Sequence, residues 1–471
     1  MRVRRRTFCI LPVAALGILV IAGTAQTPAN PWASSSWQPP PPAPGGYTGP
    51  VFKLSYDYPA QPVAPPANPP WIKALGGKPI SADNAIGYVQ ALKDYISDDM
   101  RVLTTDYSHW YDNPRKWYNV PWLFSIRDPI RGAYVGFPQD PSVFPLSNMK
   151  KKEMTDYVFV YYNDVAGYTL GQIWGKSALN PDLTKAQFQD GAIIIKAALS
   201  DATPADWSPL EGAATWELYP PVIPPPPGNP TAPTKIVTTR FFQFDIIVKD
   251  TKTAPATGWV FATLVYDKNV PGDGWTRMVP LGAMWGNDPD FNSVVTPNAP
   301  LQESVINPMA PLYAVETLGY GGRLSGPNDG AVSENNIIDG QLVPRARISS
   351  CMSCHGVAEW PLKSNLTPTV SSTANNPPDP NNPYSYVPPP GSLEFNNWFQ
   401  DRPGTMPQDA GSVALDYDMN IALKALPFWQ QYAKSRGERD ALLSQVPKGL
   451  RELVLNPAQA SKTGKTMRQP K

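Results

Sequence analysis

The sequence IVTTRFFQFDIIVK, from Ile236 to Lys249, decides the fold class of this chain. Its apolar, aromatic and β-branched residues alternate with polar ones in the manner of one long strand. Turn-forming residues follow at Thr253–Gly258, and the sequence WVFATLVY, from Trp259 to Tyr266, again has the composition of a strand. The two segments therefore predict a β-hairpin.

Other segments extend this pattern on both sides of the hairpin. Strands are predicted at 157–162, 192–199 and 275–285. Proline and glycine turns separate these runs in place of helices, which predicts an antiparallel sandwich or barrel over residues 71–340. One helix is expected within this region, capped by Ser81 and ending near Asp98. The stretch from Pro220 to Pro233 is interpreted as a long surface loop, and the glycine-rich stretch 310–330 as a connector.

Composition limits the classes of partner. The chain has 471 residues, with 40 Lys and Arg against 39 Asp and Glu, which gives a formal net charge of +1. A balance this close to neutral indicates no nucleic-acid or anionic-membrane partner. The 58 prolines are far above average usage. They are dense in residues 26–70, which are expected to form a flexible arm.

The first 25 residues have the pattern of a secretory signal peptide. A basic start with Arg2, Arg4, Arg5 and Arg6 precedes the apolar run from Phe8 to Ala22, and small residues follow. We expect cleavage after Ala25, no transmembrane helix thereafter, and a periplasmic or secreted protein. The alternative is an uncleaved anchor, but the run is shorter than the ~20 residues that a spanning helix needs.

The stretch Cys351-Met352-Ser353-Cys354-His355 has the pattern C-x-x-C-H. Two thiols at this spacing can each form a thioether with one vinyl group of the same porphyrin, and the adjacent imidazole can supply the proximal iron ligand. The third cysteine, Cys9, lies in the predicted signal peptide.

Two other chemistries use a C-x-x-C pair. A disulfide or a thioredoxin-like dithiol is one, although the glycine- and proline-rich surroundings lack the βαβ setting of a thioredoxin. Zinc is the other, but a structural zinc site needs four soft ligands and the chain has two histidines in all. The motif thus favours covalent haem.

The motif and the residues around it, 341–440, resemble the monohaem c-type cytochromes. The resemblance implies a small, mainly α-helical domain that carries one haem c, followed by a tail at 441–471. It also implies single-electron transfer to or from a redox partner protein, with the haem held by Cys351, Cys354 and His355.

The resemblance also suggests the groups around the iron. The sequence Gly404-Thr405-Met406-Pro407 is similar to the methionine loop of small cytochromes c, so Met406 is the first candidate for the sixth ligand, with Met419 or an open position as alternatives. The carbonyl of Pro368 or Pro361 is expected to orient His355. Arg345 and Arg347 are candidates to pair with the haem propionates or to form a solvated surface.

Three functions remain open from the sequence. An exported electron carrier is the leading hypothesis. A peroxidase or oxygenase would need an open iron position and a polar group near it, for which His109 and Arg347 are the candidates. Alternatively, the large β-rich region binds a polysaccharide, a surface or a partner dehydrogenase, with the haem as its electron outlet.

Overall fold

The computed structural model describes residues 40–429, apart from 124–126, 151–152, 176–177, 179, 222–234, 331, 333–334, 339–340, 372–384 and 428. The predicted signal peptide, most of the proline-rich loop and the predicted C-terminal tail lie outside the described residues. Within these residues, none of the helices has the length and apolar character needed to cross a membrane.

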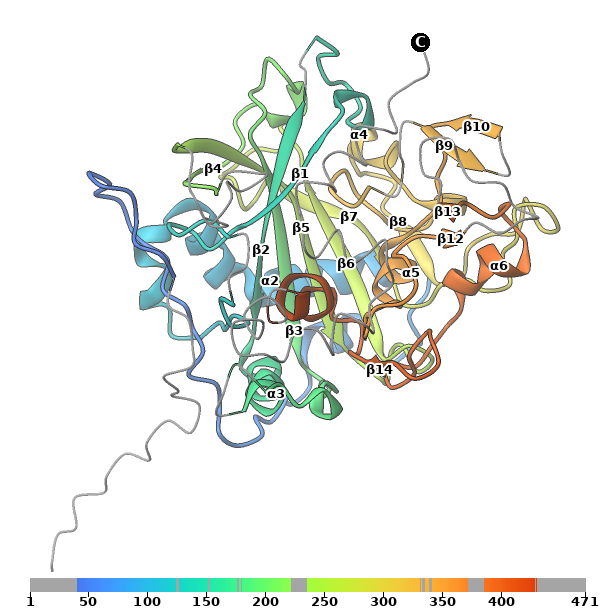
Figure 1. The fold of residues 1–471 in the computed structure, drawn as a ribbon, viewed down its shortest axis with the longest axis horizontal. Coiled ribbons are helices and arrows are strands. Elements are labelled where there is room, and N and C mark those ends of the chain that lie inside the picture. The colour runs from blue at the N-terminus through green and yellow to red at the C-terminus, as the bar shows by residue number, and fades with distance from the viewer. Residues whose placement is uncertain are drawn as a thin grey trace, which may run out of the picture.

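One antiparallel sheet of eight strands forms the centre of the molecule (Figure 1). Its main path runs β1-β2-β3-β5-β6-β7-β8, and β4 pairs with the beginning of β5. The strands are β1 (Tyr134–Gln139), β2 (Met154–Tyr162), β3 (Ile193–Ser200), β4 (Thr215–Leu218), β5 (Val237–Lys249), β6 (Trp259–Tyr266), β7 (Met278–Met284) and β8 (Ser304–Ile306).

The predicted hairpin is confirmed, because β5 and β6 pair in antiparallel register from Gln243↔Val265 to Lys249↔Trp259. The strands predicted at 157–162, 192–199 and 275–285 correspond to β2, β3 and β7. The β-rich class is therefore correct, but the sheet is a single open layer, neither a barrel nor a sandwich.

The other sheets among the described residues have two strands each: β9 (Asn335–Ile338) with β10 (Gln341–Pro344), β11 (Glu359–Trp360) with β14 (Val413–Ala414), and β12 (Val370–Ser371) with β13 (Ser385–Tyr386).

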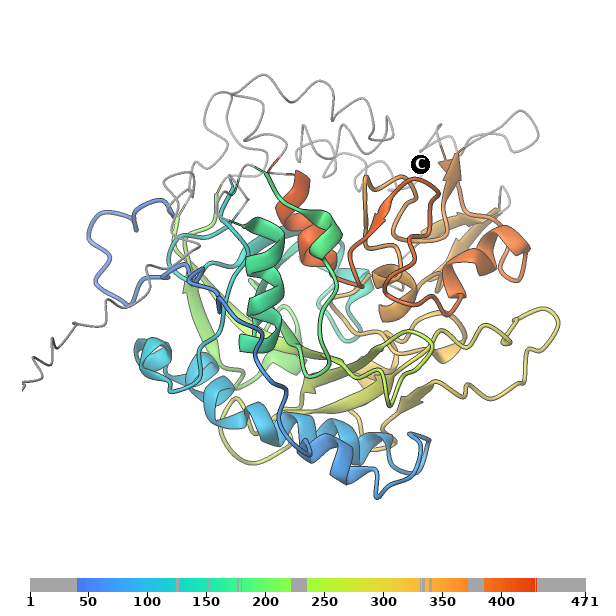
Figure 2. The same ribbon diagram turned by 90° about the horizontal axis from the view of Figure 1, so that it is seen from below.

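Helices and irregular segments take the place of a second sheet. The long helix α2 covers one face, and α3, α5 and the helical turn at 420–425 lie over the opposite face (Figures 1 and 2). The predicted helix is confirmed, although it begins after Asn84 and continues past Asp98 to Thr105. The described helices are α1 (Pro70–Ala74), α2 (Ala85–Thr105), α3 (Asp164–Trp174), α4 (Leu312–Val315), α5 (Cys351–His355), α6 (Leu393–Asn396) and a π-helical turn (Asn420–Ala425), with short 3₁₀ turns between them.

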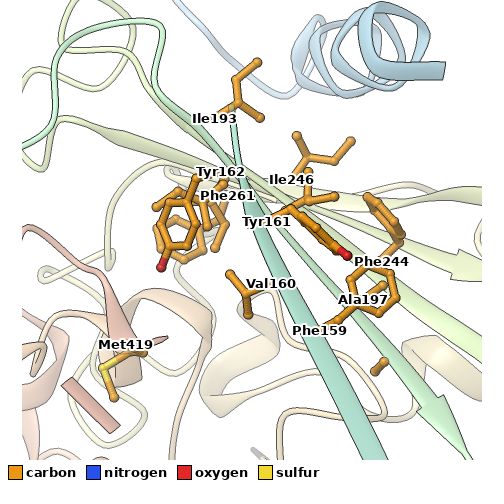
Figure 3. Packing of buried hydrophobic residues seen from close by; sticks show 14 of the residues in the cluster. Phe159, Val160, Tyr161, Tyr162, Ile193, Ala197, Phe244, Ile246, Phe261 and Met419 are labelled. Atoms are coloured by element: carbon orange, nitrogen blue, oxygen red, sulfur yellow. The ribbon is translucent and has the colours of Figure 1, made fainter. Parts of the chain in front are cut away.

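The central strands are buried on both faces. Every residue of β6 is buried, and β3 reads IIIKAALS with a single partly exposed position at Lys196. A sheet covered on both sides needs apolar residues at successive positions, which explains the continuous apolar runs of these strands. Figure 3 shows how side chains such as Val160 and Phe261 project from one face, and Phe159 and Phe244 from the other.

The proline-rich segment before α1 differs from the expected flexible arm where the structure describes it. Phe52 and Tyr58 are 4% and 2% exposed and belong to the main core. Their rings pack beside Trp122 and Tyr118, with centroids 6.1 and 5.8 Å apart. Aromatic side chains spaced along an extended chain can anchor it even when the residues between them are prolines.

Residues 341–429 do not form the mainly α-helical unit that the resemblance implies. Among the described residues of this region, α5 and α6 span five and four residues, and the helical segment that contains the π-helical turn covers residues 419–427. Cys351, Met352, Tyr417 and Met419 belong to the same hydrophobic core as the sheet. Other apolar residues of the region, such as Ile348, Phe395 and Trp398, form a second hydrophobic cluster. The region thus divides its buried side chains between the core of the sheet and this second cluster.

Candidate cofactor site

A cavity lies between the sheet and the segments that carry the C-x-x-C-H motif. Its sheet wall consists of side chains from β2, β3, β5 and β6, and its covering wall consists of residues 350–355 and 417–424, with the loop 328–329 at one side. The cavity has a volume of about 220 Å³, or about 1050 Å³ when all the space out to its open mouth is counted. These values bracket the roughly 300–1,000 Å³ of sites that hold cofactor-sized molecules.

An apolar row of side chains crosses the sheet wall. Tyr162 pairs with Ile194, Ile194 with Ile247, and Ile247 with Phe261, in register across four strands. Residues directly opposite each other on antiparallel strands place their side chains on the same face. The register thus turns four separate strands into one continuous apolar surface, and Ile194, Ile247 and Phe261 of this row line the cavity.

A polar row lies beside it on the same face of the sheet. Each of its residues is two positions away from a residue of the apolar row on the same strand. Lys196 pairs across the strands with Asp245, and Asp245 with Thr263. The Lys196 Nζ atom lies 3.1 Å from Asp245 Oδ2 and 2.6 Å from Asp329 Oδ1, and the Thr263 hydroxyl donates to Asp245 Oδ1 at 2.8 Å. Burial lowers the pKa of Lys196, but the two carboxylates outweigh this effect and raise it overall. The lysine is therefore charged and fully paired.

The glycine-rich connector brings Asp329 to this row. A Cβ atom at Gly326 would collide with the amide of Gln243, so only glycine lets the loop approach β5 this closely. Asn328 N then donates to Gln243 Oε1 at 3.0 Å, and Gln243 Nε2 donates to Asp329 Oδ2 at 2.9 Å. The loop that the sequence presents as a plain connector thus supplies a buried charge.

The motif forms the five-residue helix α5, and two serines fix its start. Ser350 Oγ accepts a hydrogen bond from Ser353 N at 3.2 Å, and Ser353 Oγ accepts one from Ser350 N at 2.7 Å. This reciprocal capping satisfies backbone donors that a short helix otherwise leaves unpaired. Residues three positions apart share one side of a helix, so Cys351 and Cys354 face the cavity together.

Both cysteines are free thiols in the structure. Burial raises the pKa of Cys354 to about 12 and raises that of Cys351 well above its ordinary value. The Cys351 Sγ atom lies 3.8 Å from Asp329 Oδ2, and this carboxylate further disfavours a thiolate. A disulfide between the two residues, one of the alternatives to haem attachment, is not formed.

The imidazole of His355 is held in one orientation. Its Nδ1 atom lies 2.8 Å from the carbonyl oxygen of Tyr417, and its ring makes an edge contact with Phe261, with centroids 4.8 Å apart. A carbonyl can only accept, so Nδ1 carries the proton and Nε2 keeps its lone pair. Burial lowers the pKa of His355 to about 4, which keeps the ring neutral at pH 7. A neutral imidazole with one free nitrogen is the form that binds a metal.

The Tyr417 carbonyl reaches His355 because of an unusual turn. Asp416 and Tyr417 have φ angles of 50° and 67°, the left-handed region that residues other than glycine rarely adopt. Buried contacts stabilise this turn. Asp416 Oδ1 accepts from Lys249 Nζ at 2.6 Å and from Trp259 Nε1 at 2.8 Å, and Oδ2 accepts from Phe188 N at 2.7 Å. The sheet thus holds the turn that orients the histidine.

The chain then enters the π-helical turn Asn420–Ala425, which lies over the sheet. Met419, Asn420, Leu423 and Lys424 line the cavity from this segment. Asp418 precedes them and accepts from the Tyr162 hydroxyl at 2.8 Å, while burial raises the pKa of this carboxyl to about 7. Figure 3 shows Met419 on this segment, across from Val160 and Phe261 of the sheet. Local departures from α-helical geometry of this kind occur often at functional sites.

The structure brings together some of the residues that the sequence predicts for the site. Cys351, Cys354, His355 and Met419 line one cavity. Met406 does not line it, and its side chain is 55% exposed. The Gly404 loop nevertheless lies close by, because a Cβ atom at Gly404 would collide with Asp416. The expected role of Pro368 or Pro361 in orienting His355 is wrong, since the carbonyl of Tyr417 takes that place.

The polar groups predicted near the iron lie elsewhere. His109 belongs to the turn after α2, where its half-exposed side chain contacts Asp106 at 2.9 Å. Arg345 and Arg347 are exposed and donate to the carbonyls of Ser142 and Glu316. None of the three lines the cavity. Among the described residues, no group of three or more His, Cys, Asp and Glu side chains is arranged to hold a metal ion by itself.

Sequence reasoning missed the residues that complete the cavity. Tyr417, Asp418 and Lys424 of the covering wall are among them, as is the partly buried pair of Lys196 with Asp329. A charged residue inside an apolar strand, as at Lys196 in IIIKAALS and Asp245 in FFQFDIIVK, was the available signal. Such a residue needs a buried partner, and this need predicts a polar site on the sheet.

No protein-family model matches this chain, and neither a curated protein nor a solved structure shows a significant match. The resemblance to cytochromes c therefore depends on the residues of the motif alone.

Proposed function

We propose that this protein is an exported c-type haem protein that carries one covalent haem and exchanges single electrons with a redox partner. One observation carries the proposal. Two free thiols and a neutral histidine with an unprotonated Nε2 atom line the same cavity, whose opposite wall is an apolar row of side chains. This is the set of groups that a porphyrin requires for two thioethers, one iron bond and an apolar surface for its ring.

Each of these residues has a definite task in the proposal. Cys351 and Cys354 would hold the haem through its vinyl groups, and His355 would bind its iron. The row of Ile194, Ile247 and Phe261 would exclude water from the ring. Bound haem would supply an iron atom that takes up and releases one electron. The Tyr417 carbonyl would keep His355 in its metal-binding tautomer and make its Nε2 atom more basic.

The sixth ligand is proposed from the same geometry. Met419 lines the cavity with its side chain 8% exposed, whereas Met406 is turned to solvent. We therefore favour Met419 over Met406. A thioether in this position would favour the reduced iron and raise the reduction potential.

The test is a mass measurement on protein from a host that matures c-type cytochromes. We expect the purified chain to carry the mass of one haem and to be coloured, and the double variant Cys351→Ala/Cys354→Ala to carry none. The matched control is Cys9→Ser, which changes a cysteine outside the motif and should leave the haem content unchanged. Colourless wild-type protein with an unmodified mass would refute the proposal.

An enzyme of the peroxidase or oxygenase type is the second candidate. One observation favours it, namely the polar groups of Asp418, Asn420 and Lys424 on the covering wall. Such groups can assist chemistry at an open iron position. Rapid binding of cyanide or carbon monoxide to the haem-loaded protein would support the enzyme. A methionine-to-iron absorption band that is lost in Met419→Leu would support the electron carrier.

A further inference from the structure

The charged side chains that line the cavity have an ion-pair or hydrogen-bond partner, with one exception among the described residues. Lys196 is paired with Asp245 and Asp329, and Asp418 is hydrogen-bonded by Tyr162. Lys424 also lines the cavity. Among the described residues it has no hydrogen bond and no ion pair, and its ammonium lies over the ring of Tyr134, 6.0 Å from Nζ to the ring centroid.

An unpaired ammonium in such a place is costly for the protein. Burial lowers the pKa of Lys424 to about 8, and the positive charge of Lys196 contributes in the same direction. A partly buried lysine is stabilised in its charged form when an anion lies beside it. The cavity therefore offers a position for a negatively charged group of its ligand.

We propose that Lys424 binds a carboxylate of the cofactor, a task that the sequence assigned to Arg345 and Arg347. This inference rests on the proposed function, because a haem carries two propionate carboxylates. The two arginines are exposed and bonded to backbone carbonyls away from the cavity. An ammonium group acts on a carboxylate as a point charge, and it needs no fixed orientation.

The proposal predicts how the reduction potential responds to removal of this charge. Reduction of the haem adds a negative charge, which a nearby ammonium stabilises. In Lys424→Gln the potential should fall, with the equilibrium constant for reduction lowered about threefold to tenfold, or roughly 30–60 mV for a one-electron couple. The potential should also vary more steeply with pH between pH 6 and 8 than it does in wild type. Without its cation the carboxylate has a higher pKa, and its deprotonation then disfavours reduction as the pH rises.

The experiment uses full-length, haem-loaded protein and spectroelectrochemical titration at several pH values. Lys424→Arg keeps the charge and should keep the potential and the pH profile of wild type. Lys73→Gln removes an exposed lysine of α1 and is the matched control, which should behave as wild type. Equal potentials and equal pH profiles for Lys424→Gln and wild type would overturn the inference. So would the loss of a low-spin spectrum in Lys424→Gln, because it would identify the lysine as an iron ligand.

The two proposals fail in different ways. If wild-type protein carries no haem, the proposed function fails and this inference fails with it. If haem is attached in wild type and in Lys424→Gln and the potentials agree, the function stands and Lys424 has no role in binding a carboxylate.

Discussion

The two walls of the cavity are built by different means. The sheet wall consists of regular strands in register, with its charges paired across neighbouring strands. The covering wall consists of a capped five-residue helix, a left-handed turn and a π-helical turn, and it holds an unpaired lysine. The sheet wall provides a fixed surface, and the groups that can bind a ligand come from the covering wall. Within one site, therefore, the regular sheet positions the ligand-binding groups and the irregular segments provide them.

The largest effect is expected where the two walls are joined. In Asp416→Asn the buried ammonium of Lys249 loses the only ion pair that it makes with the described residues, and the left-handed turn loses its charged contact with the sheet. Removal of one partner of a buried pair costs about 3–5 kcal/mol. We expect a decrease of this size in the free energy of unfolding, measured by denaturant titration. Asp190→Asn, at an exposed carboxylate that accepts from Thr251, is the control. A loss below about 1 kcal/mol would show that the turn does not depend on the sheet.

The second prediction concerns the sheet wall alone. In Lys196→Met the carboxylates of Asp245 and Asp329 lose their shared cation. We expect the free energy of unfolding to fall by about 3 kcal/mol at pH 7. The loss should be smaller at pH 4–5, where the two carboxyl groups can take up protons. Denaturant titrations at both pH values measure the difference, and equal losses at the two values would contradict the pairing.

A third prediction contrasts two carboxyl groups. Asp418 belongs to the covering wall, and Asp329 comes from the loop that pairs with Lys196 of the sheet wall. Burial raises the pKa of Asp418 to about 7, so the folded protein retains a proton that the unfolded chain releases above about pH 4. Asp418 therefore lowers stability as the pH rises from about 4 to 7. Burial raises the pKa of Asp329 as well, but Lys196 outweighs it and the net shift is downward. Asp329 therefore adds stability that is lost as the pH falls.

Two amide variants test this contrast. Asp418→Asn should reduce the loss of stability between pH 5 and 7.5 by about 2–3 kcal/mol. Asp329→Asn should instead destabilise the protein most at neutral pH. Thermal or denaturant unfolding across this pH range measures both slopes. If the two variants change the slope in the same direction, the two walls do not differ in the way described.

The smallest effect is expected at Met406. Because its side chain is 55% exposed, Met406→Ala should change the free energy of unfolding by less than about 0.5 kcal/mol. Met419→Ala removes a buried side chain from the covering wall and should cost about 2 kcal/mol or more. Denaturant titration of both variants compares their free energies of unfolding and shows which of the two methionines is packed at the proposed haem site. A larger loss for Met406→Ala would show that its loop closes over the cavity.

The contrast between the walls also explains what the sequence could predict. The strands of the sheet wall follow from continuous apolar and β-branched runs such as 193–200 and 259–266, which local composition reveals. The motif Cys351–His355 is equally local. Its partners are not, because the hydrogen bond from His355 to Tyr417 joins residues 62 positions apart. The turn at Asp416 depends on a charge from β5, which no short pattern in the sequence reveals.

In the described residues, part of the motif region shares the core of the large sheet, and a related physical reason explains this arrangement. A small haem domain that folds alone must bury its cofactor between its own helices, which requires helices of several turns. Here β2, β3, β5 and β6 supply one wall of the cavity, and the motif region supplies the other with α5 and the helical segment that begins at residue 419. The sheet therefore contributes directly to the cavity at the motif, in addition to any binding surface of its own.

The hydrogen bond between His355 and Tyr417 has a consequence for transplantation of the motif. A five-residue sequence grafted into another scaffold would carry the two sulfurs and the ring, but nothing in it would choose the tautomer. That choice is made by a backbone oxygen far along the chain, in a turn held by a lysine from the middle of the protein. Transfer of this site to another protein would therefore require β2, β3, β5 and β6 together with residues 416–424, in addition to the motif.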